Sequence, residues 1–227
     1  MPRLAFLHTS PVHVPTFERL VAQADPSVHV QHTVAEDLLR DAQQLGADHP
    51  ALVERVRQAV VQAAGGRCKV VVCTCSTIGA AAESVPAGSG VVLRIDRALG
   101  DEAVSRGSRV LVVAALRSTV GPTEALMREC ARRAGREVQL ELLVVEHAWS
   151  HFLSGDREGY LRAIAAAVRP AAHRADVVAL AQASMADAAG FLQDLGVPVL
   201  SSPALGVARA LALLRGAACP AATSGSA

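Results

Sequence analysis

The residue best placed to do chemistry in this sequence is Cys75, which ends an apolar run and is followed by Ser76 and Thr77. We expect that run to be a buried strand, and either hydroxyl residue to cap the helix that follows it. A thiol at such a junction lies beside unpaired N–H groups and the positive end of a helix dipole, which lower its pKa and favour the thiolate. The pattern therefore predicts a reactive cysteine, although free cysteines in apolar strands are also typical of core packing.

Two other groupings contain residue types that bind metals or carry redox chemistry. Cys73 falls on the same strand face as Cys75, which is the spacing of a Cys-x-Cys pair. His147 and His151 are one helical turn apart, with Glu146 beside them. Neither grouping has the further ligands that a zinc site needs, and the sequence contains no Gly-rich phosphate cradle and no Gly-x-Ser-x-Gly elbow. We therefore predict neither a metal ion nor a cofactor.

The elements that position these residues follow an alternating pattern. Short runs rich in β-branched residues alternate with longer Ala-, Leu- and Arg-rich stretches of helical period, which is typical of a parallel α/β fold. We expect strands at Leu4–Leu7, Val28–His32, Lys69–Cys75, Val91–Arg94, Arg109–Ala115, Val138–Val145, Asp176–Ala181 and Val197–Leu200. We expect helices at Pro15–Ala24, Pro50–Ala64, Thr123–Ala134, Arg157–Val168, Ser184–Leu195 and Pro203–Leu214.

The chain also contains a weak internal repeat. Arg67–Ile78 resembles Arg174–Met185, and this match pairs Cys75 with Gln182. Two further matches, at nearly the same separation along the chain, pair Thr9-Ser10 with Ser118-Thr119 and Glu36-Asp37 with Glu146-His147. Matches in the same order at a nearly constant separation predict two pseudo-symmetric parallel-sheet α/β lobes related by a twofold axis.

Such lobes direct the carboxyl ends of their strands toward a shared cleft, where open parallel sheets bind their ligands. The residues predicted to line this cleft are Thr9, Ser10, Cys75, Ser76, Thr77, Ser118, Thr119, Gln182, Ala183 and Ser184. His147, which matches Asp37 of the other half, is a second catalytic candidate that would orient a carboxylate or donate a proton. His8 directly precedes the first cleft loop and is expected to be a hydrogen-bonded structural residue.

Composition excludes several classes of protein. A net charge of +1 with 3% aromatic residues argues against nucleic-acid binding, and no apolar run reaches the roughly 20 residues of a membrane span. Five scattered cysteines without a secretion signal indicate reduced thiols in the cytoplasm. The length of 227 residues fits two small, closely joined lobes. We expect residues 1–95 plus 203–216 to form the first lobe, residues 96–202 the second, and residues 217–227 a disordered tail.

The sequence resembles the aspartate/glutamate/hydantoin racemase superfamily over nearly its whole length. Cys75-Ser76-Thr77 is similar to the superfamily's Cys-Asn-Thr, and Leu180–Ala186 is similar to the Leu-Gly-Cys-Ala-Gly-Met-Ala of hydantoin racemases. Ser118-Thr119-Val120 and Gly155-Asp156-Arg157 add to the likeness. The resemblance implies two α/β lobes, a cofactor-free site between them, and a homodimer or higher homo-oligomer.

The resemblance also implies a mechanism, from which this sequence departs at one position. In the superfamily two cysteines face one substrate carbon, and one removes the α-proton while the other returns a proton to the opposite face. Cys75 matches the first of these thiols. Gln182 stands at the second, and a carboxamide exchanges hydrogen bonds but is neither an acid nor a base. Symmetric racemisation by two thiols is therefore in doubt.

Three functions remain open. The first is a racemase or isomerase acting at the α-carbon of a small carboxylate, of amino-acid or hydantoin type, in which His147 or a water held by Gln182 carries the second proton. The second is a lyase that decarboxylates a malonate-type acid, with Cys75 protonating the enolate. The third is a protein that binds a small carboxylate without converting it. Arg94 and Arg117 follow strands and are candidate clamps for a second carboxylate, although a solvated position is the more typical role of such arginines.

Overall fold

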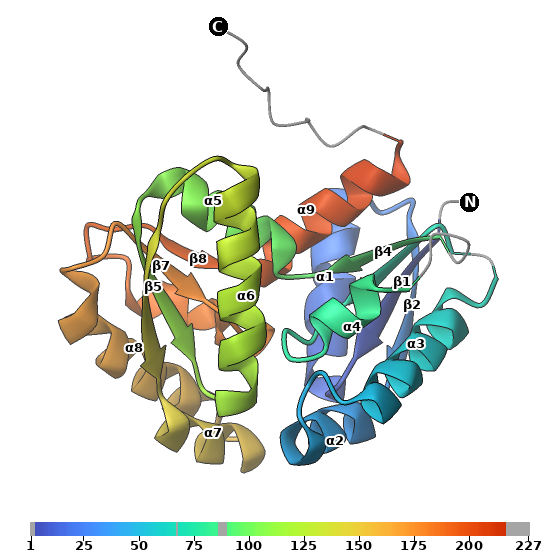
Figure 1. Ribbon diagram of the computed structural model, residues 1–227, viewed down its shortest axis with the longest axis horizontal. Coiled ribbons are helices and arrows are strands. Elements are labelled where there is room, and N and C mark those ends of the chain that lie inside the picture. The colour runs from blue at the N-terminus through green and yellow to red at the C-terminus, as the bar shows by residue number, and fades with distance from the viewer. Residues whose placement is uncertain (1–2, 67, 86–89, 217–227) are drawn as a thin grey trace, which may run out of the picture.

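The computed structural model describes residues 3–66, 68–85 and 90–216, and these form two parallel four-stranded sheets (Figure 1). The first sheet has the order β2-β1-β3-β4 and the second the order β6-β5-β7-β8. The strands are β1 (Arg3–His8), β2 (His29–Val34), β3 (Val70–Cys73), β4 (Val91–Arg94), β5 (Arg109–Ala114), β6 (Gln139–Val144), β7 (Val177–Leu180) and β8 (Val199–Ser201). The predicted fold class, an α/β protein with two similar parallel-sheet lobes, is confirmed.

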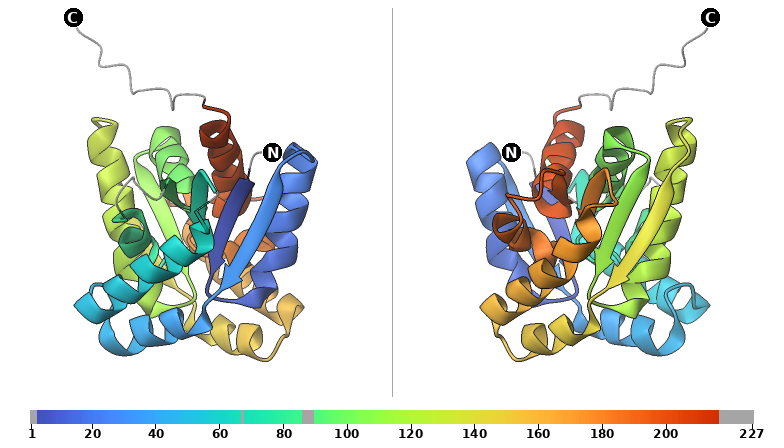
Figure 2. Two further views of the ribbon diagram at one scale, coloured as in Figure 1. Left: turned by 90° about the vertical axis from the view of Figure 1, so that its right-hand side faces the viewer. Right: turned by 90° about the vertical axis from the view of Figure 1, so that its left-hand side faces the viewer.

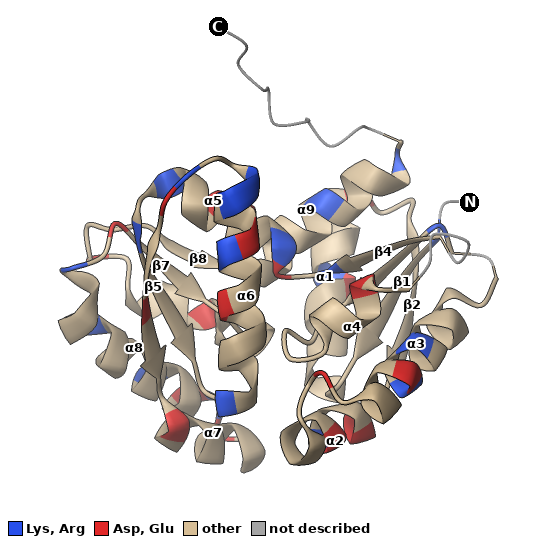
Figure 3. Cartoon of the chain, viewed as in Figure 1, with Lys and Arg blue, Asp and Glu red and all other residues tan. Residues whose placement is uncertain are grey.

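Helices connect successive parallel strands, as parallel pairing requires. The α-helices are α1 (Val14–Ala24), α2 (Glu36–Leu45), α3 (Pro50–Ala64), α4 (Gly79–Glu83), α5 (Arg97–Arg106), α6 (Arg117–Arg133), α7 (Glu146–Leu153), α8 (Arg157–Ala172) and α9 (Ser202–Leu214). The 3-10 helices within the described residues are η1 (Pro11–His13) and η3 (Ala183–Phe191). Charges of both signs are interspersed over the helices and loops (Figure 3). Among the described residues, no helix has the length and apolar character needed to cross a membrane.

The two lobes repeat the same arrangement, and the two side views of Figure 2 resemble each other closely. Leu7 pairs with Cys73 in the first sheet, and Val113 pairs with Leu180 in the second. Cys73 therefore corresponds to Leu180, which agrees with the predicted pairing of Cys75 with Gln182, and Leu7 corresponds to Val113.

The match expected for the first cleft loop was wrong. Because Leu7 corresponds to Val113, the residues equivalent to Thr9-Ser10 are Ala115-Leu116. Ser118-Thr119, which the sequence match had paired with Thr9-Ser10, lies further along the chain, in the first turn of α6.

The lobes exchange helices across their boundary. Helix α5 follows the first sheet but packs on the second, where Leu99 joins the cluster around Val112. Helix α9 follows the second sheet but packs on the first, where Val207 joins the cluster around Phe6. We keep the division into residues 1–95 plus 203–216 and residues 96–202 as a proposal. The predicted tail, residues 217–227, lies outside the described residues.

Local sequence explains most of the elements. The central strands β3 and β7 are apolar and buried at every position, as strands covered on both faces must be. Helix α3 ends at Ala64 and is capped by Gly65, whose φ of 54° lies in the left-handed region that glycine adopts without strain.

Two helix predictions need correction. Helix α6 begins at Arg117 rather than Thr123, and it contains Pro122 at its sixth position. The α-helix expected at Ser184–Leu195 is instead η3, which buries Met185 and Ala188. Residues three apart share a face in a 3-10 helix, and this spacing suits that pair.

Candidate active site

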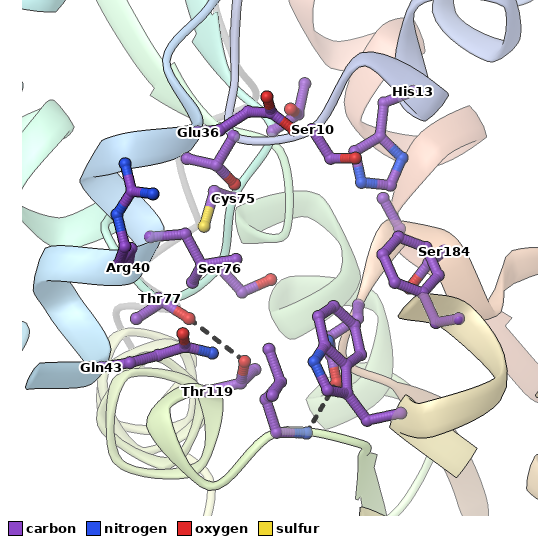
Figure 4. Close-up of a pocket in the computed structure, with 18 of the residues that line it drawn as sticks. Ser10, His13, Glu36, Arg40, Gln43, Cys75, Ser76, Thr77, Thr119 and Ser184 are labelled. Carbon is purple, nitrogen blue, oxygen red and sulfur yellow. Dashed lines mark hydrogen bonds between the residues drawn. The ribbon is translucent and has the colours of Figure 1, made fainter. Parts of the chain in front are cut away.

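A cavity of about 290 Å³ lies between the lobes, at the carboxyl ends of the strands (Figure 4). Its lining residues are Thr9, Ser10, His13, Glu36, Leu39, Arg40, Gln43, Thr74, Cys75, Ser76, Thr77, Leu116, Thr119, Trp149, Phe152, Leu153, Gln182, Ala183 and Ser184. Loops after β1, β3 and β7, together with the start of α6, form its floor. Helices α2 and α7, which occupy equivalent places in the two lobes, form the walls of its mouth.

Most residues predicted from the sequence line this cavity, and the exceptions are Ser118 and His147. Ser118 and Thr119 both belong to the first turn of α6, and of the two it is Thr119 that reaches the cavity. On α7 the cavity face carries Trp149, Phe152 and Leu153, which leaves His147 exposed to solvent. The residue predicted to carry the second proton therefore lies outside the cavity.

Among the cysteines that the structure describes, Cys75 is the one that lines the cavity, and Figure 4 shows its sulfur pointing into the open space. Cys73, two residues earlier, is fully buried, and burial raises the pKa of its thiol, so it stays protonated. Its Sγ lies 3.6 Å from the carbonyl oxygen of Cys75, a weak contact that fixes it inside the strand layer. The structure thus gives the two cysteines different environments.

The expected capping of a helix by Ser76 or Thr77 was wrong. Helix α4 begins only at Gly79, with Ile78 at its N-cap. Instead, Ser76 donates a hydrogen bond of 2.7 Å to the carbonyl oxygen of Ala181, and the Thr77 hydroxyl lies 3.2 Å from that of Thr119. Both bonds cross from the first lobe to the second, so these hydroxyl groups hold the cavity floor together.

Gln182 occupies the position equivalent to Cys75, and its side chain binds the backbone N–H groups at the end of β5 in its own lobe. Its Oε1 accepts hydrogen bonds from the backbone N–H groups of Ala115 at 2.6 Å and Leu116 at 3.3 Å. A carboxamide held in this way cannot exchange protons with carbon. The second lobe therefore contributes neither a thiol nor these two N–H groups to a bound ligand.

Behind Cys75, a chain of hydrogen bonds runs from the cavity toward the surface. The Thr74 hydroxyl donates to the carbonyl of Leu7 at 3.2 Å, so it accepts from His8 Nδ1–H at 2.8 Å. Nε2 of His8 then accepts from His32 Nδ1–H at 2.8 Å. Nε2 of His32 lies 3.8 Å from the carboxylate of Glu18. His8 is therefore a hydrogen-bonded structural residue, as expected, and it fixes the residue next to Cys75.

The buried position of His8 predicts that the free energy of unfolding depends on pH. Burial, helped by repulsion from His32 and His13, lowers the pKa of His8 from 6.5 to about 3. Below about pH 6.5 His8 binds a proton in the unfolded chain but stays neutral in the folded chain. The folded protein therefore becomes less stable as the pH falls toward 3. The expected slope is about 1.4 kcal/mol per pH unit for this proton. It is measured by urea unfolding between pH 7 and pH 4.5.

His8→Gln should remove the contribution of this one proton, about 1.4 kcal/mol per pH unit, from the slope. The same change at His173, an exposed residue at the end of α8, should leave the slope unchanged. Equal slopes in the two variants would show that His8 titrates normally in the folded chain.

A buried ion pair supports the loop that carries Cys75. Arg94 binds Asp96 through two hydrogen bonds of 2.7 and 2.9 Å, and it also donates to the Ser76 carbonyl at 3.2 Å. Gly79 leaves room for this, since a Cβ there would lie 2.9 Å from Nε of Arg94. Arg117 is exposed and pairs with Glu146. Neither Arg94 nor Arg117 lines the cavity, so neither is the carboxylate clamp for which the sequence made them candidates.

The two walls of the mouth differ in chemistry. Helix α2 presents Glu36, Arg40 and Gln43, whereas α7 presents an apolar face in which Trp149 and Phe152 stack with ring centroids 4.4 Å apart. The sequence did not predict these wall residues. No helix was expected at residues 36–45, and in the α7 segment only Glu146 and the two histidines were candidates. The spacing of Glu36, Leu39, Arg40 and Gln43, three or four residues apart, was the available signal.

Comparison with known proteins now identifies the family. The profile of the Asp/Glu/hydantoin racemase family matches residues 3–210. The chain belongs to this family. No curated sequence relative matches this racemase-family chain.

Solved structures show the same fold. An aspartate racemase from Picrophilus torridus superposes with a TM-score of 0.73 at 12% identity, covering 95% of each chain. A variant of arylmalonate decarboxylase, with a glycine changed to cysteine and a cysteine to serine, gives a TM-score of 0.61 at 18% identity and covers 97% of each chain. Allantoin racemase from Pseudomonas fluorescens gives 0.56 at 20% identity, covering 94% of this chain and 91% of its own.

Proposed function

We propose that this protein is a cofactor-independent enzyme of the isomerase type, which transfers a proton at the α-carbon of a small carboxylate through Cys75. The observation that carries the proposal is the position of this thiol, which opens into the inter-lobe cavity beside hydroxyl groups from both lobes (Figure 4). A thiol is a competent acid and base near neutral pH, and removal of an α-proton from a carboxylate needs such a group close to the carbon.

The cavity floor is suited to the charge that develops. Ser10, Thr77 and Thr119 place hydroxyl groups at the floor. Abstraction of the α-proton turns a carboxylate into an enolate, whose additional negative charge falls on the carboxylate oxygens. Preorganised O–H and N–H donors stabilise that charge more than they stabilise the ground state. We infer that these groups hold the carboxylate while Cys75 faces the α-carbon.

Gln182 favours a second candidate, a decarboxylase. When a malonate-type acid loses carbon dioxide, the breaking C–C bond leaves its electron pair on the α-carbon, and no base is needed. Cys75 would then give its S–H proton to that carbon, and water would return a proton to the thiolate. One acid suffices for this reaction, and Cys75 has no thiol counterpart at the equivalent position in the second lobe.

Proton NMR in D2O tests both candidates with a panel of small carboxylates. The panel holds both enantiomers of several amino acids, 5-substituted hydantoins and substituted malonates. Exchange of the α-proton, or interconversion of enantiomers, supports the isomerase. Loss of a malonate with formation of an α-deuterated monoacid identifies the decarboxylase. A panel that is silent while the Cys75 thiol is intact would contradict the proposed function.

The aromatic wall at the mouth of the cavity indicates which substrates the enzyme prefers. Because α7 offers stacked aromatic rings, we expect the substrate to carry an apolar or aromatic substituent on its α-carbon. Trp149→Ala should raise KM for such substrates about tenfold, equal to ~1.4 kcal/mol, with a smaller change in kcat.

Gln43→Ala on the opposite wall is the matched control and should leave the KM for apolar substrates within about twofold, equal to ~0.4 kcal/mol. Both variants are assayed on one apolar and one dicarboxylic substrate. An equal loss for the two substrates in Trp149→Ala would refute the preference.

A further inference from the structure

His13 is a titratable side chain of the cavity for which the reaction so far has no use. It ends η1, in the loop between β1 and α1, and lines the cavity together with Ser184 of the second lobe. Figure 4 shows the His13 ring and the Cys75 sulfur directed into the cavity from different positions, with Ser10 between them and His13 toward Ser184. Ser184 lies in the first turn of η3, directly after Gln182, so His13 borders the side of the cavity from which a second thiol would act.

We propose that His13 is the second proton-transfer residue, acting on the face of the α-carbon opposite Cys75. The inference rests on the proposed function and makes it specific, because the site becomes an asymmetric thiol–imidazole pair in place of two thiols.

The surroundings of the ring suit this role. Neighbouring rings orient His13: its centroid lies 6.5 Å from that of Phe17 in an edge-on contact and 6.4 Å from that of His8. Within residues 3–66, 68–85 and 90–216, neither ring nitrogen of His13 has a protein hydrogen-bond partner, so both are available to a ligand or water. His13 and Ser184 also border a neighbouring cavity of about 200 Å³, so the ring stands where two open spaces meet.

The protonation state is also suitable. Burial lowers the pKa of His13 to about 4, so the imidazole is neutral at pH 7 and able to accept a proton. An imidazolium whose pKa is lowered in this way is in turn a strong enough acid to return that proton readily. In contrast, both ring nitrogens of His8 are hydrogen-bonded, to Thr74 and His32, so His8 is unavailable for catalysis.

The proposed reaction balances without any further reactant. A ring nitrogen of His13 takes the α-proton of one enantiomer, and the C–H electron pair enters the enolate. The S–H group of Cys75 then gives its proton to the opposite face, which leaves an imidazolium and a thiolate. The other enantiomer reacts in the reverse sense, from thiolate and imidazolium, and water in the cavity re-equilibrates the two proton states.

The test uses α-proton exchange in D2O, measured separately for each enantiomer of a substrate that the unmodified chain converts. In His13→Gln we expect the exchange rate of one enantiomer to fall at least about 100-fold, whereas the enantiomer deprotonated by Cys75 still exchanges. Interconversion of the enantiomers should stop. Cys75→Ser should show the complementary pattern, with exchange retained only for the other enantiomer.

Two further variants separate catalysis from packing. His13→Cys restores a titratable group and should recover interconversion relative to His13→Gln, which a merely structural role for His13 would not produce. His173→Gln, at an exposed position, should leave both exchange rates unchanged.

Equal loss of both enantiomers in His13→Gln, or no loss of either, would overturn the role of His13 while leaving that of Cys75 standing. If the unmodified chain exchanges neither enantiomer of any substrate, the proposed function fails, and the role of His13 fails with it.

Discussion

Replacing Cys75 with serine is expected to stop interconversion of substrate enantiomers, with a fall in rate of about 10²–10⁴-fold. A serine hydroxyl keeps nearly the same shape at the cavity floor, but it is a far weaker acid than a thiol and cannot form the anion at neutral pH. Because Cys75 is only partly buried, the free energy of unfolding should change by less than about 1 kcal/mol. The rate is measured by NMR in D2O and the stability by urea unfolding.

Cys73→Ser is the matched control, because it makes the same chemical change two residues away. Cys73 is fully buried with only a weak sulfur contact, so its replacement should cost about 1–3 kcal/mol of stability and leave the rate nearly unchanged. Retained interconversion in Cys75→Ser would exclude Cys75 as the proton-transfer residue. A large loss of rate in Cys73→Ser at unchanged stability would indicate a paired-thiol mechanism instead.

Asp96→Asn should be the most damaging of these changes to the fold, with a loss of about 3–5 kcal/mol in the free energy of unfolding. The side chains of Arg94 and Asp96 are 3% and 1% exposed, and the substitution leaves the buried guanidinium without its hydrogen-bonded carboxylate. Since Arg94 also holds the Ser76 carbonyl, the loop beside Cys75 should loosen as well, and substrate binding should weaken. Urea unfolding and KM measure the two effects.

An exposed pair of similar geometry is the control for this prediction. Arg117 and Glu146 are bound through two hydrogen bonds but are 76% and 53% exposed, so Glu146→Gln should cost less than about 1 kcal/mol. Adding Arg94→Met to Asp96→Asn removes the stranded charge and should recover part of the lost stability. Asp96→Asn with a cost as small as that of Glu146→Gln would show that water reaches the Arg94 guanidinium.

The fold and part of the equivalence between the two halves were predictable from the sequence because they depend on local patterns. Strands buried on both faces must be apolar throughout, and the apolar runs at Val70–Cys73 and Val177–Leu180 agree with strands that the structure buries at every position. Repetition of that pattern in the second half of the chain paired Cys75 with Gln182, and the registers of the two sheets agree with this pairing.

The partners of the site residues were decided only by the tertiary structure. Ser76 and Thr77 were expected to serve the next helix, but their hydroxyl groups bond to Ala181 and Thr119 of the opposite lobe, which are distant along the chain. The orientation of α7 directs His147 to solvent and Trp149 into the cavity. The loop after β1 places His13 in the same cavity, and no local sequence pattern predicts this. Sequence periodicity reports which face of an element is apolar, whereas the meeting of polar side chains depends on how two lobes dock, and no local pattern encodes that.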